Sequence, residues 1–327
     1  MSPTGIVALE KAQFGIETTP GTLVAADTVL VCEGGGQYQP MIDRQWIQDN
    51  HGLLAPVAYL DVMKGAQFSF RHALDFEQIL LPLLTGIQSG TPAGSDPYTW
   101  TFLPDPATVE DLKAATLEYS IFDGTTRHLQ REAGFGTCSR FAITGGFNQP
   151  AMIEYDMFTR APQTSTFTAS QAALTRTLVP SNLFGLFIDT SWANLGTTQK
   201  EVILRSFRYE VNTGAAPNYT LDQRTDLDFT GLRRGMILGT VELVLEYGAA
   251  GDAEYDAWEA GTNRFISLEV AVGSKTLVLQ AHIELTENPT FGEADGLRTV
   301  TLRGQMCYDA TSTNFMNVEV VNALAAF

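Results

Sequence analysis

The chain has 327 residues, of which 44% are hydrophobic and 17% charged, a composition typical of a globular rather than a disordered protein. Its 20 Lys and Arg against 37 Asp and Glu give a formal net charge of −17, which argues against binding of nucleic acid through a basic surface and otherwise fits an acidic, soluble one. No uninterrupted apolar run reaches the about 18 residues that a membrane-spanning helix needs.

The amino terminus predicts neither export nor a core element. It lacks the basic and apolar segments of a secretory signal, and the cysteines Cys32, Cys138 and Cys307 are odd in number and widely spaced. We therefore expect reduced thiols and folding in the cytoplasm. Residues 1–28 contain Pro3, Pro20 and little apolar alternation, so we expect an extended amino-terminal arm that becomes ordered against a neighbour.

The next residues predict a strand followed by a short helix. Alternating apolar residues in Gly65–Phe70 indicate a half-buried strand, and the apolar residues of Leu74–Leu84 indicate a helix that ends at Gly86. Pro82 should kink this helix or end it early. The segment Ser89–Ala107, rich in Pro and Gly, reads as an inserted loop. A strand at Thr116–Tyr119 and a strand pair at Phe141–Thr144 and Ile153–Phe158 follow.

The same plan recurs in the second half at an offset of 175 residues, as from Phe68 to Leu243. A strand at Ile237–Leu245 precedes a helix at Ala253–Ala260 that ends at Gly261. A strand at Ser267–Val270 and a strand pair at Leu277–Leu285 and Arg298–Tyr308 complete the copy, now at an offset of 151 from Leu117 to Leu268 because the first copy carries the insertion.

This duplication predicts a mainly β chain of two tandem β-sandwich or partial-barrel domains, each with one short flanking helix. We place the amino-terminal arm at 1–28, the first domain at 29–165, a linker at 166–180 and the second domain at 181–327. Two like domains in one chain can occupy two like positions in a ring, which favours a geometric role.

Motifs for catalysis, cofactors or metals are incomplete. Gly34–Gly36 lacks dinucleotide spacing, Gly273–Thr276 lacks the upstream glycine of a phosphate loop, and Asp226–Gly231 lacks the terminal Glu of a calcium loop. The four histidines are far apart, and His282 reads as a solvated residue on the polar face of a strand. We expect no enzyme activity, cofactor or metal.

The ordered set of short segments resembles the tail tube proteins of long-tailed bacteriophages in their two-domain form, over nearly the whole chain. The segments that carry the resemblance are Ala8–Lys11, Glu17–Ala25, Gly65–Phe70, Leu117–Glu118, Gly231–Arg234, Gly239–Leu243 and Tyr255–Gly261. The resemblance implies a structural virion protein whose rings, trimeric with pseudo-sixfold symmetry for a two-domain chain, stack into a hollow tube.

The implied partners follow from that role. They are further copies of the chain, a tape-measure protein in the bore, tail terminator and distal tail or baseplate proteins at the ends, and DNA that passes through without specific binding. The implied location is the virion tail, assembled in the cytoplasm of the bacterial host, with no membrane contact.

Two sets of residues are candidates for assembly. The long loops at Pro40–Gly52 and Ala215–Arg234 resemble the family's contact to the adjacent ring, and such long loops are usually functional or disordered. Their candidate residues for contact between rings are Trp46, Asp49, His51, Asp222, Arg224 and Arg234. Acidic candidates for an electrostatically repulsive bore are Glu118, Glu242, Glu246 and Glu269, although any of them can face outward instead.

Two alternatives stay open. A tail terminator or distal tail ring would share the assembly features. A non-catalytic β-sandwich binding module, or an enzyme on that scaffold, would need a cleft with convergent polar groups.

Overall fold

The structure, a computed structural model, describes residues 9–49, 52–123, 125–201, 203–221 and 226–327. The strands of the first half are β1 (Lys11–Ile16), β2 (Thr28–Leu30), β3 (Gln37–Ile47), β4 (Ala58–Ala73), β5 (Ala93–Gly94), β6 (Tyr98–Phe102), β7 (Ala115–Phe122), β8 (Arg127–Gly146), β9 (Met152–Thr159) and β10 (Gln163–Thr164), with helix α1 (Leu80–Gly86). The second half contains β11 (Ala172–Ala173), β12 (Gly185–Asp189), β13 (Leu204–Asn212), β14 (Ala215–Asn218), β15 (Gly231–Arg234), β16 (Leu238–Glu246), β17 (Arg264–Val272), β18 (Lys275–Leu285), β19 (Thr290–Ala294), β20 (Leu297–Met306) and β21 (Met316–Asn322), with helix α2 (Ala249–Glu259). The predicted mainly β fold is confirmed.

The two halves share one strand order. In the first half β3, β4, β9, β8, β7 and β1 pair in succession. In the second half β13, β16, β20, β18, β17 and β12 pair in the same succession. All these pairs are antiparallel, and a short helix follows β4 and β16 alike. The duplication read from the sequence is therefore also a duplication of topology.

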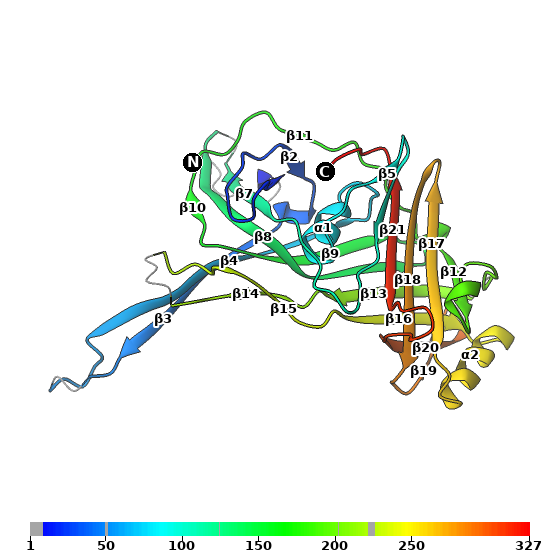
Figure 1. Cartoon of the computed structure of the whole chain (residues 1–327). Helices are drawn as coiled ribbons and strands as arrows, with labels where there is room; N and C mark the ends of the chain where they lie inside the picture. Colours follow the sequence, from blue (N-terminus) through cyan, green and yellow to red (C-terminus); the bar gives the residue numbers. More distant parts are fainter. Residues whose placement is uncertain (1–8, 50–51, 124, 202, 222–225) are drawn as a thin grey trace.

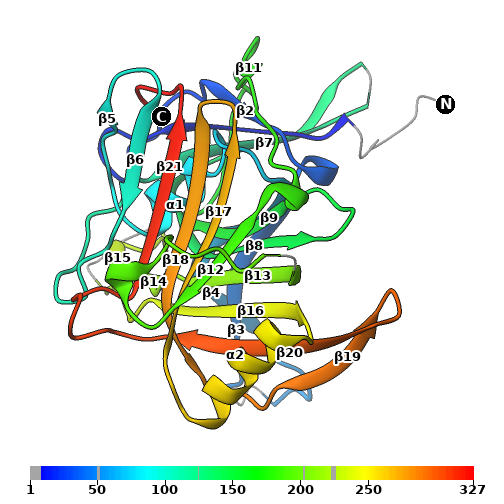
Figure 2. The ribbon, with the colours of Figure 1, turned by 90° about the vertical axis from the view of Figure 1, so that its right-hand side faces the viewer.

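The halves join edge to edge into one long layer. Strand β8 pairs with β13 over Arg140–Gly146, a ladder that we call the seam. The layer then runs β3, β4, β9, β8, β13, β16, β20, β19. Figure 2 shows β13, β16 and β20 of this layer crossing β17, β18 and β21 of a second layer steeply, as in an orthogonal sandwich.

The core lies between these layers and the helices. Helix α1 is buried on every side, which explains why its sequence is apolar all round. Asp75 caps the turn before it, because its Oδ1 accepts hydrogen bonds from the backbone N–H of Glu77 (3.0 Å) and Gln78 (2.6 Å). Helix α1 begins at Leu80 rather than at the predicted Leu74, so Pro82 falls in the first helical turn, where the lack of an N–H costs little and the expected break is wrong.

Two other expectations about local structure need correction. Lys11–Ile16, placed in the extended amino-terminal arm, is strand β1, buried between β2 and β7. The segment Ser89–Ala107, expected to be a loop, contains β6, which pairs with β21 of the second half. Trp100 in β6 is buried, and its indole N–H donates to the carbonyl of Leu324 at 3.2 Å. The insertion thus connects the two halves.

Candidate assembly surfaces

Strands β3 and β4 form a long hairpin that projects from the body of the molecule (Figure 1). Trp46 is 61% exposed, and its ring meets the ring of Tyr59 edge-on at 5.6 Å between centroids. Further exposed apolar side chains on the hairpin are Met41, Ile42, Ile47, Leu53, Leu54, Val57, Leu60 and Val62. An exposed apolar surface of this kind is typical of sites that contact another molecule.

The expected pair of equivalent loops proves unequal. Residues 37–47 are strand rather than loop, and they give the long hairpin its length. The counterpart in the second half, β14 with β15, lies back on the first half, where the carbonyl of Leu227 accepts a hydrogen bond from the N–H of Lys64 (3.1 Å). Phe229 is buried there against Phe135. Of these two counterparts, only the first-half hairpin projects freely in the described part of the chain (Figure 1).

The candidates for contact between rings separate accordingly. Trp46 and Asp49 lie on the exposed hairpin. Arg234 is partly buried, and its Nη1 donates to the carbonyl of Gly86 (2.9 Å) and its Nη2 to that of Ile87 (3.3 Å). It thus satisfies carbonyls at the end of α1, and its part in a contact between rings stays a prediction. His51, Asp222 and Arg224 lie outside the described residues.

Both ends of the long layer are open edges within the part of the chain that the structure describes. Strand β3 pairs there only with β4, and β19 pairs only with β20. In Figure 1 the two edge strands lie at opposite ends of the molecule. An unpaired edge offers a row of backbone N–H and C=O groups to another strand.

Glu118, expected to face a bore, is instead buried, with 2% of its surface exposed. Its carboxylate accepts hydrogen bonds from Gln13 Nε2 (2.7 Å) and from the backbone N–H (2.7 Å) and hydroxyl (2.5 Å) of Thr168. These donors tie β1 and the connecting segment to β7. Glu118 is therefore a structural residue, and the interpretation as a bore residue is wrong.

The other three acidic candidates are partly exposed. Glu242 pairs with Arg303 (3.2 Å), Glu246 pairs with Arg205 (2.6 Å), and Glu269 accepts a hydrogen bond from Ser267 (2.7 Å). Two of the three carboxylates are thus matched by an arginine. Their position in a bore stays a prediction.

A network of charges crosses the seam on the face of the long layer that points away from the core. Arg140 contacts Glu154 (3.0 Å), Asp156 (3.3 Å) and Glu210 (2.7 Å), and Arg208 contacts Glu154 (2.7 Å) and Glu210 (2.8 Å). The hydrogen bond with Glu210, followed by Glu154, raises the pKa of Arg140. Partial burial alone would raise the pKa of Glu210, but the hydrogen bonds from Arg140 and Arg208 outweigh it and lower that pKa.

This network was missed at the level of sequence. The signal is the alternation in Glu154-Tyr-Asp156 and in Arg208-Tyr-Glu210. In each of the two strands it places both charged side chains on the same face. Without knowledge of which strands are neighbours, the alternation indicated only solvated strand faces. The pairing at the seam brings these two sets of charged side chains together.

A cleft of about 710 Å³ lies beside residues 104–110, 234–238 and 305–308. His282 lies close to this region and is buried, stacked on Phe265 at 4.4 Å between centroids, so the expectation of a solvated His282 is wrong. The Cys307 thiol is 3.4 Å from its Nδ1, but burial raises the pKa of that thiol, which keeps it protonated rather than nucleophilic.

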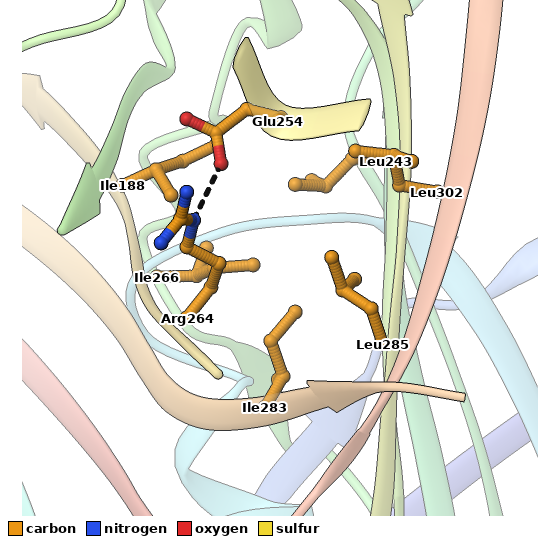
Figure 3. Close-up of a pocket in the computed structure, with 8 residues that line it drawn as sticks. All are labelled: Ile188, Leu243, Glu254, Arg264, Ile266, Ile283, Leu285 and Leu302. Carbon is orange, nitrogen blue, oxygen red and sulfur yellow. Dashed lines mark hydrogen bonds and ion pairs between the residues drawn. The ribbon is translucent and has the colours of Figure 1, made fainter. Parts of the chain in front are cut away.

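A second, smaller cavity of about 10 Å³ lies under α2 (Figure 3). Glu254 is buried at its wall and pairs with Arg264 (2.8 Å) and Lys200 (3.1 Å), while the rest of the lining is aliphatic. Such a volume holds about one water molecule. The buried carboxylate is therefore neutralised in place and has no room beside it for a substrate.

Across the described ranges no three His, Cys, Asp or Glu side chains gather as they would around a metal ion. Neither helix in the described part of the chain is long and apolar enough to cross a bilayer. Compared with known proteins, the chain matches no protein-family model, and no curated protein is detectably similar to it.

Proposed function

We propose that this chain is a structural protein that assembles with copies of itself into stacked rings, of the tail tube type that its sequence resembles. Three copies form a ring with pseudo-sixfold symmetry, and the stacked rings make the hollow tail of a bacteriophage. DNA then leaves through the bore. The observation that carries the proposal is that two halves of the same strand order join in one continuous layer, both of whose edges are open in the described chain.

A ring requires every subunit to present two different, complementary surfaces, and the two ends of the long layer meet that requirement. Because the halves are alike, a chain already contains one copy of the neighbour relationship that the ring repeats. Fusion of the halves raises the effective concentration for that contact to roughly millimolar.

The projecting β3–β4 hairpin supports stacking. It extends beyond the body and carries its apolar side chains in the open, a distribution that a solitary protein rarely keeps. In the proposed tube the side chains toward the tip of the hairpin, Trp46 among them, contact the next ring. The layer's face with the seam network lines the bore, and there each arginine of the network already holds a carboxylate, which leaves little positive charge for DNA.

The test is direct. Electron microscopy of the concentrated protein should show rings or filaments of stacked rings, and mass measurement should give three chains per ring. Rings of six chains would contradict the trimer, and a strict monomer at all concentrations would contradict assembly.

The large cleft favours one other candidate, a binding module for an apolar ligand. That alternative predicts a monomer that takes up an apolar fluorescent probe.

A further inference from the structure

The seam inside the chain shows how one half of this protein pairs with another. The outer part of β8, residues 140–146, lies antiparallel to β13. Within this ladder Phe141 faces Val211. Both side chains are buried, and the charge network covers the opposite face of the same strands. The seam is thus a complete junction, with an apolar side and a polar side.

Each side of the seam has a counterpart at an open edge. Strand β13 stands beside β16 as β3 stands beside β4. Strand β19 pairs with β20 in the same way that the outer part of β8 pairs with β9. The strands that meet at the seam, the outer part of β8 and β13, therefore correspond to β19 and β3, the two strands of the long layer that have no second neighbour in the described chain.

The offset of 175 residues fixes the register on the β3 side. Ile42 faces Lys64 in β4, and Val211 faces Gly239 in β16. Because Lys64 and Gly239 are 175 positions apart, Ile42 corresponds to Val211.

The register on the β19 side follows in the same way. In the first half, Phe141 faces Tyr155 in β9, and Tyr155 faces Phe70 in β4. In the second half, Phe291 faces Val300 in β20, and Val300 faces Leu245 in β16. Phe70 and Leu245 are again 175 positions apart, so Phe291 corresponds to Phe141. Since Phe141 faces Val211 at the seam, the counterpart of that pair is Phe291 with Ile42.

We propose that β3 of one copy adds antiparallel to β19 of the next copy, with Ile42 opposite Phe291. This inference deepens the proposed ring and rests on it, because it names the junction by which the ring closes. The remaining cross-strand pairs in this register are Asp43 with Thr290, Met41 with Gly292, Pro40 with Glu293, and Gln39 with Ala294.

The side chains fit this pairing. Ile42 is 46% exposed and Phe291 is 43% exposed, and each buries apolar surface when it faces the other. Met41 is also exposed, and in this register it lies opposite Gly292, which has no side chain to oppose it. A second copy of the chain is the occupant because the template is this chain's own internal junction. The two edges are at opposite ends of one molecule (Figure 1).

The junction between copies differs from the seam in chemistry. Where the seam pairs Arg140 with Glu210, the corresponding residues between copies are Thr290 and Met41. Pro40 has no backbone N–H, so the ladder between β3 and β19 loses at most one hydrogen bond at that position. The junction between copies therefore relies on apolar contact and backbone hydrogen bonds, and its formation should depend little on salt.

Crosslinking between two single variants tests the register. One protein carries Ile42→Cys and the other Phe291→Cys, and they are mixed, allowed to assemble and oxidised mildly. Thiols held together react at an effective concentration of roughly millimolar, so the mixture should give at least about tenfold more covalent dimer than either protein alone. The matched control replaces Ile42→Cys by Gln37→Cys, which lies five residues along β3, about 17 Å away.

The outcomes separate this proposal from the proposed function. A dimer from the in-register mixture but not from the control supports the junction. Rings in the microscope with crosslinks only in the control, or in neither mixture, overturn this register while self-assembly stands. Absence of any oligomer of the parent protein at high concentration overturns self-assembly and the junction with it.

Discussion

Arg140 of β8 and Glu210 of β13 hydrogen-bond across the seam, with 2.7 Å between Nε and Oε1, at the point where the two halves of the chain become one layer. Each belongs to a strand of a different half. Arg140 also contacts Glu154 and Asp156 on its own side, so one guanidinium holds carboxylates from both halves.

Replacement of Arg140 should therefore weaken the connection between the halves. Arg140→Met leaves three carboxylates facing one another, with only Arg208 to compensate. Because these groups are about one third exposed, we expect a loss of only about 1–2 kcal/mol in the free energy of unfolding at pH 7. Urea unfolding measures it. Arg303→Met, which removes a more exposed arginine, is the control and should cost less than about 1 kcal/mol.

The same network predicts a dependence on pH. The pKa values of Glu154 and Glu210 are lowered in the folded chain, because the hydrogen bonds from the two arginines outweigh partial burial. The stabilisation that these pairs give is present above the unfolded pKa of 4.5 and is lost as pH falls through the folded values. The difference between parent and Arg140→Met should shrink below pH 4.5. A difference that stays constant would place the effect in packing rather than charge.

The buried Glu254 should matter more for stability than any exposed carboxylate. Glu254→Gln leaves Arg264 and Lys200 without their counter-charge in a buried place, and breaking a buried pair costs about 3–5 kcal/mol. Glu287→Gln, at an exposed pair with Arg303, is the matched control and should change stability by less than about 1 kcal/mol. Thermal and urea unfolding compare the two. Equal small effects would show that the Glu254 site reorganises or admits water.

His72 should make the protein less stable in mild acid. Burial lowers the pKa of His72 below 6.5, although its hydrogen bond to the Ala73 carbonyl and the nearby Asp75 charge oppose this. The unfolded chain then binds the proton more tightly, so stability is full above pH 6.5 and falls as pH decreases toward the folded pKa. Unfolding followed from pH 8 to 5 should show a slope of up to about 1.4 kcal/mol per pH unit. His72→Gln should flatten that slope; an unchanged slope would assign it to other groups.

Trp46 should contribute to assembly and not to the fold. Because its side chain is largely exposed, Trp46→Ala should change the free energy of unfolding by less than about 0.5 kcal/mol. It should nevertheless shorten or abolish stacked filaments, as judged by electron microscopy at equal protein concentration. Val109→Ala removes another exposed apolar side chain, away from the hairpin, and should leave filament length unchanged. Normal filaments from the Trp46 variant would show that other surfaces carry the stacking.

The repeated plan was predictable because it depends on local patterns. Alternation at Phe68 and Phe70, and again at Leu243 and Leu245, indicates half-buried strands whatever their partners are. Gly261 adopts a left-handed backbone, with φ of 63°, as the predicted end of α2 requires. These features follow from a few neighbouring residues. The fold class is therefore readable from sequence.

What was not predictable depends on distant partners. Glu118 reads as a solvated strand residue, yet Gln13 and Thr168, far away in sequence, bury it. Strand β1 reads as an arm because its apolar pattern is short, and its burial comes from β2 and β7 on either side. The edges and the seam were likewise invisible, because a sequence does not state which strands have only one neighbour.

The pairing of β6 with β21 bears on how the chain reaches its folded state during synthesis. The hydrogen bond from Trp100 to Leu324 spans 224 residues, so β6 leaves the ribosome long before its partner exists. Contacts of such long range form late and slow folding. A truncated chain, cut off before residue 316, keeps β3 and β19 but lacks the strand that covers β6 and β18. The core around β6 is therefore completed only after β21 has been synthesised, because β21 is the strand that joins β6 to β18.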